Sequence, residues 1–112
     1  MTTDRELLVL AAKAAGIAVN EHIGMRHDYF ADANTGKEWN PLTDDGDGAR
    51  LEAALGMSVN WYGAMVLVGP NVRGIKMGSQ FPEYFEKHGG DKQAARRRAG
   101  LRAAASIGES MP

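Results

Sequence analysis

The chain opens with an amphipathic helical pattern. Apolar residues recur at helical spacing between residues 4 and 15, in a stretch made almost wholly of good helix formers. Thr3 and Glu6 have the spacing of a capping box, so a helix is predicted to begin at Asp4. Gly16 is placed to end this helix, because glycine adopts the left-handed conformation freely.

Short β-prone segments follow the first helix. Ile17-Ala18-Val19 predicts a strand that continues through Ile23, and residues 26–31 predict a second strand. Asn34-Thr35-Gly36 is a turn signal. We therefore expect residues 28–31 to pair with residues 37–39 as a hairpin.

A second helix is predicted over Asp44–Leu55. The Thr43 hydroxyl is placed to cap it, and the aspartates of its first turn are favoured by the helix dipole. Gly56 is the expected stop.

A strand pattern returns after Gly56. Met57–Tyr62 and Ala64–Val68 are β-prone runs broken by Gly63, which predicts a hairpin. Gly69-Pro70-Asn71 then predicts a turn, and Val72–Met77 a further strand.

The C-terminal third combines an irregular segment with a long helix. Gly78–Gly90 is rich in aromatic residues and is expected to form a covering loop or a short helical turn. An alanine-rich helix is predicted over Asp91–Ile107, with Gly108 placed to terminate it.

The order of these elements predicts an α+β fold. Three helices alternate with groups of two or three strands, which fits helices packed on a mainly antiparallel sheet of about four to six strands, a layered α/β/α sandwich. The sequence contains no internal repeat and no long linker, so residues 1–112 are expected to form a single domain. The pattern leaves the oligomeric state open.

Composition narrows the classes of function. The absence of cysteine excludes disulfide frameworks, thiolate metal sites and cysteine nucleophiles. The 13 basic and 14 acidic residues give a net charge of −1, which argues against a domain-wide attraction for nucleic acid. We expect no secretory signal, because the N-terminus carries acidic residues and lacks a positively charged start followed by an apolar stretch. We expect no membrane span, because no stretch approaches about 18 apolar residues.

Catalytic signatures are missing from the sequence. His22, His27 and His88 lack metal-ligand spacing, no serine lies in a Gly-x-Ser-x-Gly elbow, and no phosphate-binding glycine loop is present. We expect no enzymatic activity, cofactor or metal. A hydrolase that uses His22 or His27 with an aspartate is the hypothesis with the least support.

The acidic segment Asp44-Asp45-Gly46-Asp47-Gly48 is a first candidate site. Its alternating carboxylates and glycines are similar to those of a calcium-binding loop. When the segment is aligned with such a loop, however, Ala54 falls at the position where a bidentate Glu is required. An N-capped acidic first turn is the simpler interpretation.

Arginines gather on the third predicted helix. Residues 91–102 hold five Lys or Arg side chains against one acid, and Arg97 falls within the apolar arc centred on Leu101. Two interpretations are open. Arg97 lays its methylenes on the sheet or pairs with an acid such as a second-helix aspartate, or Arg97, Arg98 and Arg102 bind a phosphate or carboxylate.

Aromatic residues supply candidates for contact with a partner. Neighbouring strand residues point to opposite sides, so either Trp61 or Tyr62 must leave the core-facing side. The candidate interaction surface comprises Trp39, Asp44, Asp45, Asp47 and Tyr84.

The most distinctive segment runs from Trp39 to Asp47 and reads WNPLTDDGD. With Glu6–Ile17 near one end of the chain and Arg97–Gly108 near the other, it resembles a family of small proteins encoded by tailed bacteriophages and prophages, the phage ABA-sandwich domain. The resemblance implies a layered fold and a location in the bacterial host cytoplasm. It implies no reaction.

Two functional hypotheses follow. The first is a non-enzymatic accessory protein that binds a host or phage protein through a sheet edge, the aromatic loop or the acidic segment. The alternative is a binder of nucleic acid or of a small phosphorylated ligand at Arg97, Arg98 and Arg102.

Overall fold

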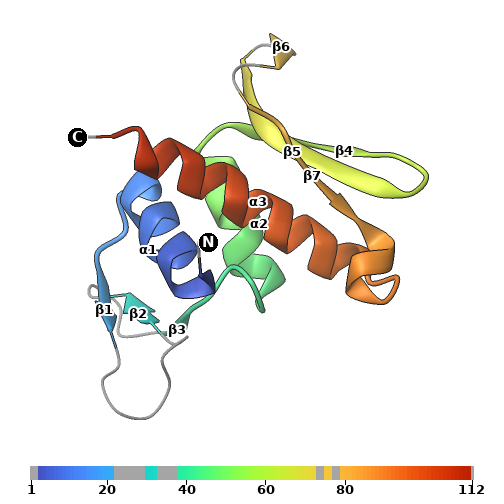
Figure 1. Ribbon diagram of the computed structural model, residues 1–112. Coiled ribbons are helices and arrows are strands. Elements are labelled where there is room, and N and C mark those ends of the chain that lie inside the picture. The colour runs from blue at the N-terminus through green and yellow to red at the C-terminus, as the bar shows by residue number, and fades with distance from the viewer. Residues whose placement is uncertain (1–2, 22–29, 33–37, 73–74, 77–78, 112) are drawn as a thin grey trace.

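Three α-helices and seven strands make up the described part of the chain. The computed structural model describes residues 3–21, 30–32, 38–72, 75–76 and 79–111 (Figure 1). The helices are α1 (Asp4–Ala15), α2 (Asp45–Ala54), the 3₁₀ turn η1 (Phe85–His88) and α3 (Lys92–Glu109). The strands are β1 (Val19–Glu21), β2 (Phe30–Asp32), β3 (Glu38–Trp39), β4 (Met57–Trp61), β5 (Met65–Val72), β6 (Ile75–Lys76) and β7 (Phe81–Tyr84). The predicted α+β class is confirmed.

The strands form two antiparallel sheets. The smaller has the order β1-β2-β3, and in it Phe30 lies opposite Trp39. The predicted hairpin between residues 28–31 and 37–39 is thus confirmed for its described residues, while the predicted turn at 34–36 lies outside them. In the larger sheet, β5 lies between β4 and β7, and β6 pairs with the far end of β5.

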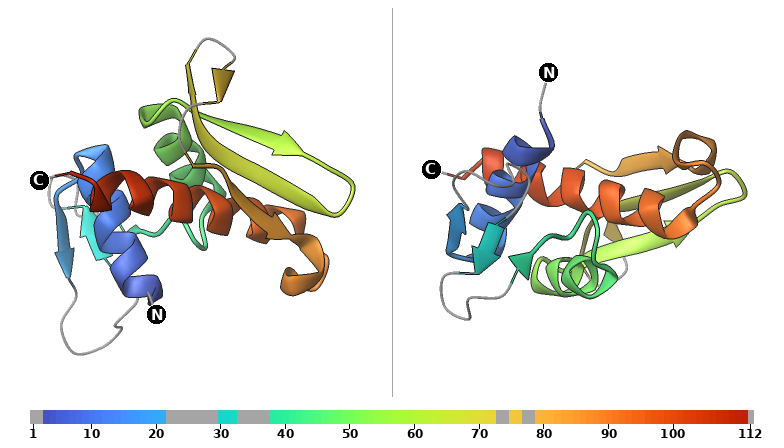
Figure 2. Two further views of the ribbon diagram at one scale, coloured as in Figure 1. Left: turned by 45° about the horizontal axis from the view of Figure 1, so that its top comes forward. Right: turned by 90° about the horizontal axis from the view of Figure 1, so that it is seen from below.

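Helix α3 lies between the larger sheet and the other two helices (Figures 1 and 2). Alanines spaced four residues apart on one face of α3 pack against Val66 and Val68 of β5. The opposite face contributes Leu101 and further small residues to a second core with α1 and α2. Alanine lets backbones approach closely, so α3 packs in two directions despite having few large apolar side chains. The sheet-facing alanines are Ala95, Ala99 and Ala103.

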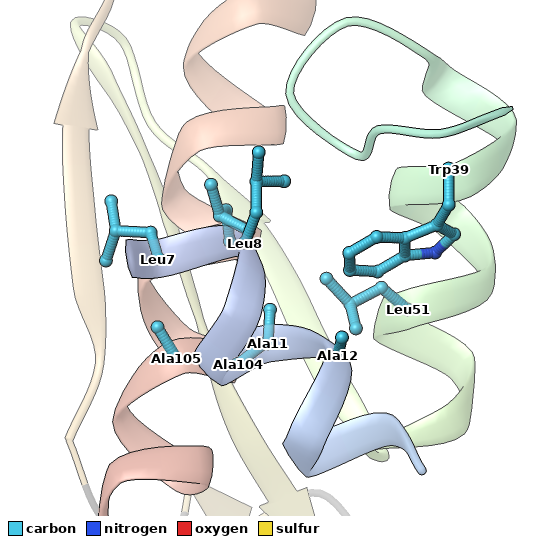
Figure 3. Close-up of a cluster of buried hydrophobic side chains, with 9 residues drawn as sticks. Leu7, Leu8, Ala11, Ala12, Trp39, Leu51, Ala104 and Ala105 are labelled. Carbon is cyan, nitrogen blue, oxygen red and sulfur yellow. The ribbon is translucent and has the colours of Figure 1, made fainter. Parts of the chain in front are cut away.

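Trp39 belongs to this second core. Figure 3 shows its indole beside Leu51 of α2, with Ala12 of α1 nearby. Only 6% of Trp39 is exposed. The tryptophan that begins the WNPLTDDGD segment therefore ties β3 to two helices.

Helix boundaries agree closely with the capping pattern. The Thr3 hydroxyl accepts a hydrogen bond from the Glu6 amide at 3.2 Å, and Gly16 follows α1 with φ of 71°. The expected cap of α2 was wrong by one residue, because the Asp44 carboxylate, rather than the Thr43 hydroxyl, accepts from the Asp47 amide at 3.1 Å. A carboxylate is as effective as a hydroxyl in capping a helix N-terminus. Its negative charge also interacts favourably with the positive end of the helix dipole.

The predicted turn at Gly69-Pro70-Asn71 was wrong, since all three residues belong to β5. Pro70 is tolerated because it lies opposite Met57 of β4 in a pair that exchanges no hydrogen bonds. On its other side it lies past the last pair that β5 makes with β7 and before the first pair that β5 makes with β6. Its missing N–H therefore removes no ladder hydrogen bond, and its carbonyl accepts one from Gln80 Nε2 at 3.1 Å.

The irregular segment Gly78–Gly90 contains an unpredicted strand. Phe81–Tyr84 forms β7 along β5, and the expected short helical turn is present as η1. The strand was not predicted because proline within a segment usually argues against a strand. Pro82 lies opposite Leu67, three pairs along the ladder from the pair that is bonded through the Phe85 amide and the Ala64 carbonyl. Because bonded and non-bonded pairs alternate, the position of the missing N–H faces the free edge of β7.

Gly108 does not end the third helix, which continues to Glu109. A Cβ at residue 108 would overlap the carbonyl oxygen of Leu10. This glycine therefore permits the close crossing of α1 and α3. None of the helices in the described part is long and apolar enough to cross a membrane.

Candidate functional site

Arg97 is held by two partners within the molecule. Its Nη1 donates to Asp45 Oδ1 at 2.6 Å, and its Nε donates to the Leu42 carbonyl at 2.7 Å. The guanidinium side chain is largely buried, whereas that of Asp45 is more than half exposed. This is the pairing with a second-helix aspartate that the sequence left as one of two interpretations.

Arg98 and Arg102 are also paired with carboxylates. Arg98 donates to Asp4 Oδ1 at 2.8 Å, and Arg102 donates to Glu83 and to the Pro82 carbonyl. Both arginines line a shallow cleft of about 300 Å³ between α1, α3 and β7. Each of the three candidate arginines is thus paired with a carboxylate that compensates its positive charge. This pairing reduces their attraction for an external anion.

Two buried carboxylates organise this basic helix. Glu83 receives Arg102 and lies 2.8 Å from His88 Nε2, while Glu52 pairs with Arg96 at 2.5 Å. Burial raises the pKa of Glu52 above its usual range, although the Arg96 charge opposes this shift. Sequence reasoning missed both acids, because nothing in their local pattern marks a partner many residues away.

The acidic segment serves the fold. The Asp47 carboxylate accepts from the Asn40 amide at 2.9 Å and from Arg50 at 2.6 Å, while Asp44 caps α2 and Asp45 pairs with Arg97. Among the described residues, no group of three histidine or carboxylate side chains is arranged to hold a metal ion. His22 and His27 lie outside the described residues.

The candidate interaction surface needs correction at two positions. Trp39 is buried and Asp47 is only 7% exposed, so neither can form an external surface. Both were interpreted as surface groups because an isolated sequence does not show which side of a short segment faces the core. Tyr84, in contrast, is 47% exposed.

The strand register places Tyr84 in a row of apolar side chains on the outer face of the larger sheet. Tyr84 pairs with Met65 in the ladder between β7 and β5, and the Tyr62 amide bonds to the Met65 carbonyl at 2.8 Å. Directly opposed residues of antiparallel strands point to the same side. Because Val66, the next residue of β5, faces α3, this row faces away from α3.

The outer face of this sheet is exposed and uncharged. Tyr62 and Tyr84 expose 49% and 47% of their surface, and Met65 between them is half-buried. The next row consists of Asn60, Leu67 and Pro82, again without a charge. In the sequence, no charged residue occurs between Glu52 and Arg73.

Trp61 points to the opposite side from Tyr62, as the alternation along a strand requires. Its ring centroid lies 6.1 Å from that of Phe85, at the open end of the core beneath the sheet, and it is 47% exposed. The expectation that one of these two aromatics leaves the core-facing side is confirmed for Tyr62. Sequence reasoning did not find Met65, because its place between two tyrosines depends on the pairing of three strands.

Comparisons with protein-family models, with curated proteins and with solved structures find no match.

Proposed function

We propose that this chain is a non-enzymatic binding module that holds a protein partner on the outer face of its larger sheet. The supporting observation is the row formed by the exposed Tyr62 and Tyr84 with the half-buried Met65 between them. Tyrosine and methionine are enriched in protein interfaces, because they combine a large contact area with an adaptable or polar end. A flat surface without charges favours a partner whose own contact surface is apolar at its centre.

The nature of the partner is proposed from the family resemblance. The similarity of Trp39–Asp47 to phage ABA-sandwich proteins suggests a host or phage protein in the cytoplasm of a phage-infected or lysogenic bacterium. The acidic segment and the arginines, in contrast, are engaged in contacts within the molecule, which favours the exposed tyrosine row as the contact surface.

The test compares two tyrosine variants with a matched control. Tyr62→Lys and Tyr84→Lys each place a charge in the row, whereas Val9→Lys places the same charge on an exposed apolar position of α1. The tagged proteins are used to recover partners from phage-infected cells, and the recovered partner is then purified and titrated. We expect each tyrosine variant to raise the Kd by about tenfold or more, and Val9→Lys to leave it near the wild-type value.

Two results would contradict the proposal. One is a partner that binds the tyrosine variants and the wild type equally well. The other is a partner lost equally with Val9→Lys, because that loss would indicate a general effect of added charge rather than contact at the row.

One observation keeps a second function in view. Arg98 and Arg102 line the same cleft, so displacement of their carboxylates by a phosphate would place two guanidiniums on one ligand. For this nucleic-acid or phosphate-binding alternative, binding of a labelled oligonucleotide or of a phosphorylated ligand must weaken steeply with salt and with Arg98→Ala. If binding is unaffected by both salt and Arg98→Ala, this alternative is excluded.

A further inference from the structure

The two edges of the larger sheet are built differently. At the β7 edge, Pro82 has no N–H to offer, and its carbonyl accepts from Arg102 at 2.8 Å. Proline and charged side chains are the usual means by which proteins protect an edge strand from pairing. The β7 edge is therefore closed to a further strand.

The β4 edge has none of these protections. Between Gly56 and Met65 there is no proline and no charged residue. In the described part of the chain, β4 pairs with β5 alone, and the left view of Figure 2 shows it at the rim of the sheet. Such an edge is a ready template for another strand.

The backbone groups that face this edge follow from the register. The Tyr62 amide bonds to the Met65 carbonyl and the Asn71 amide to the Gly56 carbonyl, so even-numbered residues of β4 bond to β5. The N–H and C=O groups of Met57, Val59 and Trp61 therefore point outward. They have no hydrogen-bond partner among the described residues.

We infer that β4 pairs antiparallel with β4 of a second copy of this chain, about a two-fold axis through Val59. In this register, Met57 lies opposite Trp61 of the second copy, and Val59 lies opposite its own counterpart. All the outward-facing groups then meet in pairs that exchange two hydrogen bonds each. The larger sheet becomes continuous across the dimer.

The side chains of β4 suit this self-pairing. Ser58 lies opposite Asn60 of the second copy on the outer face, so the Asn60 side-chain amide, which donates to Ser58 Oγ at 3.3 Å within the chain, also comes within reach of the serine of the second copy. On the inner face, the exposed ring of Trp61 gains the half-buried Met57 of the second copy as a contact. Since β4 is uncharged, pairing two copies brings no like charges together. A second copy thus complements the edge at each position.

The oligomeric state in solution tests the inference. Sedimentation equilibrium of the purified chain should show a reversible monomer–dimer equilibrium with a Kd in roughly the micromolar range, as a small interface predicts. Val59→Pro removes an outward N–H and no bond to β5, so it should raise the dimer Kd by about tenfold or more. Circular dichroism and thermal melting check that this variant folds.

A register-specific rescue adds a second, independent readout. Asn60→Lys brings two lysines near the two-fold axis and should weaken the dimer, whereas Ser58→Glu combined with Asn60→Lys should restore it, because each glutamate then faces a lysine of the other copy. Tyr84→Lys is the matched control on the far strand and should leave dimerisation unchanged.

A chain that stays monomeric at all concentrations overturns the inference, as does a dimer that is indifferent to Val59→Pro or is not restored by the paired charges. If the monomeric chain instead binds an added extended peptide through β4, the edge serves another protein and the inference is wrong. None of these measurements requires the partner of the proposed function, so the two can fail separately.

Discussion

At the scale of single residues, charge pairing decides what counts as a site. The sequence places the cationic Arg97 on the apolar face of its helix. In the structure its guanidinium donates hydrogen bonds to an aspartate and to a backbone carbonyl. The helical wheel correctly indicated that this side chain needs a partner. It could not choose between an internal carboxylate and an external anion, because both have the same chemistry.

The Asp47 carboxylate offers a stability prediction. Asp47→Ala removes the buried carboxylate that accepts from the backbone amide of Asn40, so we expect the free energy of unfolding to fall by about 1–3 kcal/mol. Glu86→Ala is the control, because it removes an exposed carboxylate and should cost under about 1 kcal/mol. Urea denaturation of both variants measures the difference. Equal losses would contradict the distinct structural role of Asp47.

Glu52 predicts a pH dependence of stability. Its pKa is raised in the folded chain by burial, so the folded state holds this proton at pH values where the unfolded state has released it. The contribution of Glu52 to stability is therefore complete below its unfolded pKa and falls as the pH rises through the folded pKa. We expect the stability of the wild type relative to Glu52→Gln to decrease as the pH rises from about 4 to neutrality. Urea unfolding across this range would contradict the raised pKa if the difference stayed constant or increased.

At the scale of elements, local signals located helices better than strands. The predicted start of the first helix at Asp4 is confirmed, and Gly16 and Gly56 follow their helices with positive φ. The errors occurred where a local breaker is tolerated by the tertiary structure. Pro70 and Pro82 lie in strands at positions where no ladder bond is required of them.

Gly108 gives the clearest prediction at this scale. Gly108→Ala should raise helix propensity by about 1 kcal/mol yet destabilise the chain by about 2 kcal/mol or more, because the new Cβ overlaps the Leu10 carbonyl. Gly46→Ala is the control, since its Cβ meets only flexible, exposed side chains, and it should be neutral or stabilising. Thermal unfolding of the two variants provides the measurement. A stabilised Gly108→Ala would show that the two helices do not cross closely at this point.

At the scale of the whole molecule, α3 is the element on which the others assemble. One face supports the larger sheet and the other supports α1 and α2, so both cores depend on it. This arrangement leaves the outer face of the sheet uncovered by any helix in the described part of the chain (Figure 2). The exposed tyrosine row results from that one-sided covering, whereas the β4 edge is open because β4 pairs only with β5 among the described residues.

The sequence by itself determined the α+β class, the positions of the three helices and the hairpin of β4 with β5. These features depend on periodicity, caps and turns, which act over a few residues. Only the tertiary structure decided the division of the strands into two sheets, the strand at Phe81–Tyr84 and the partners of the arginines. Strand pairing and ion pairing join residues far apart in the chain, and no local pattern states which distant residue completes them.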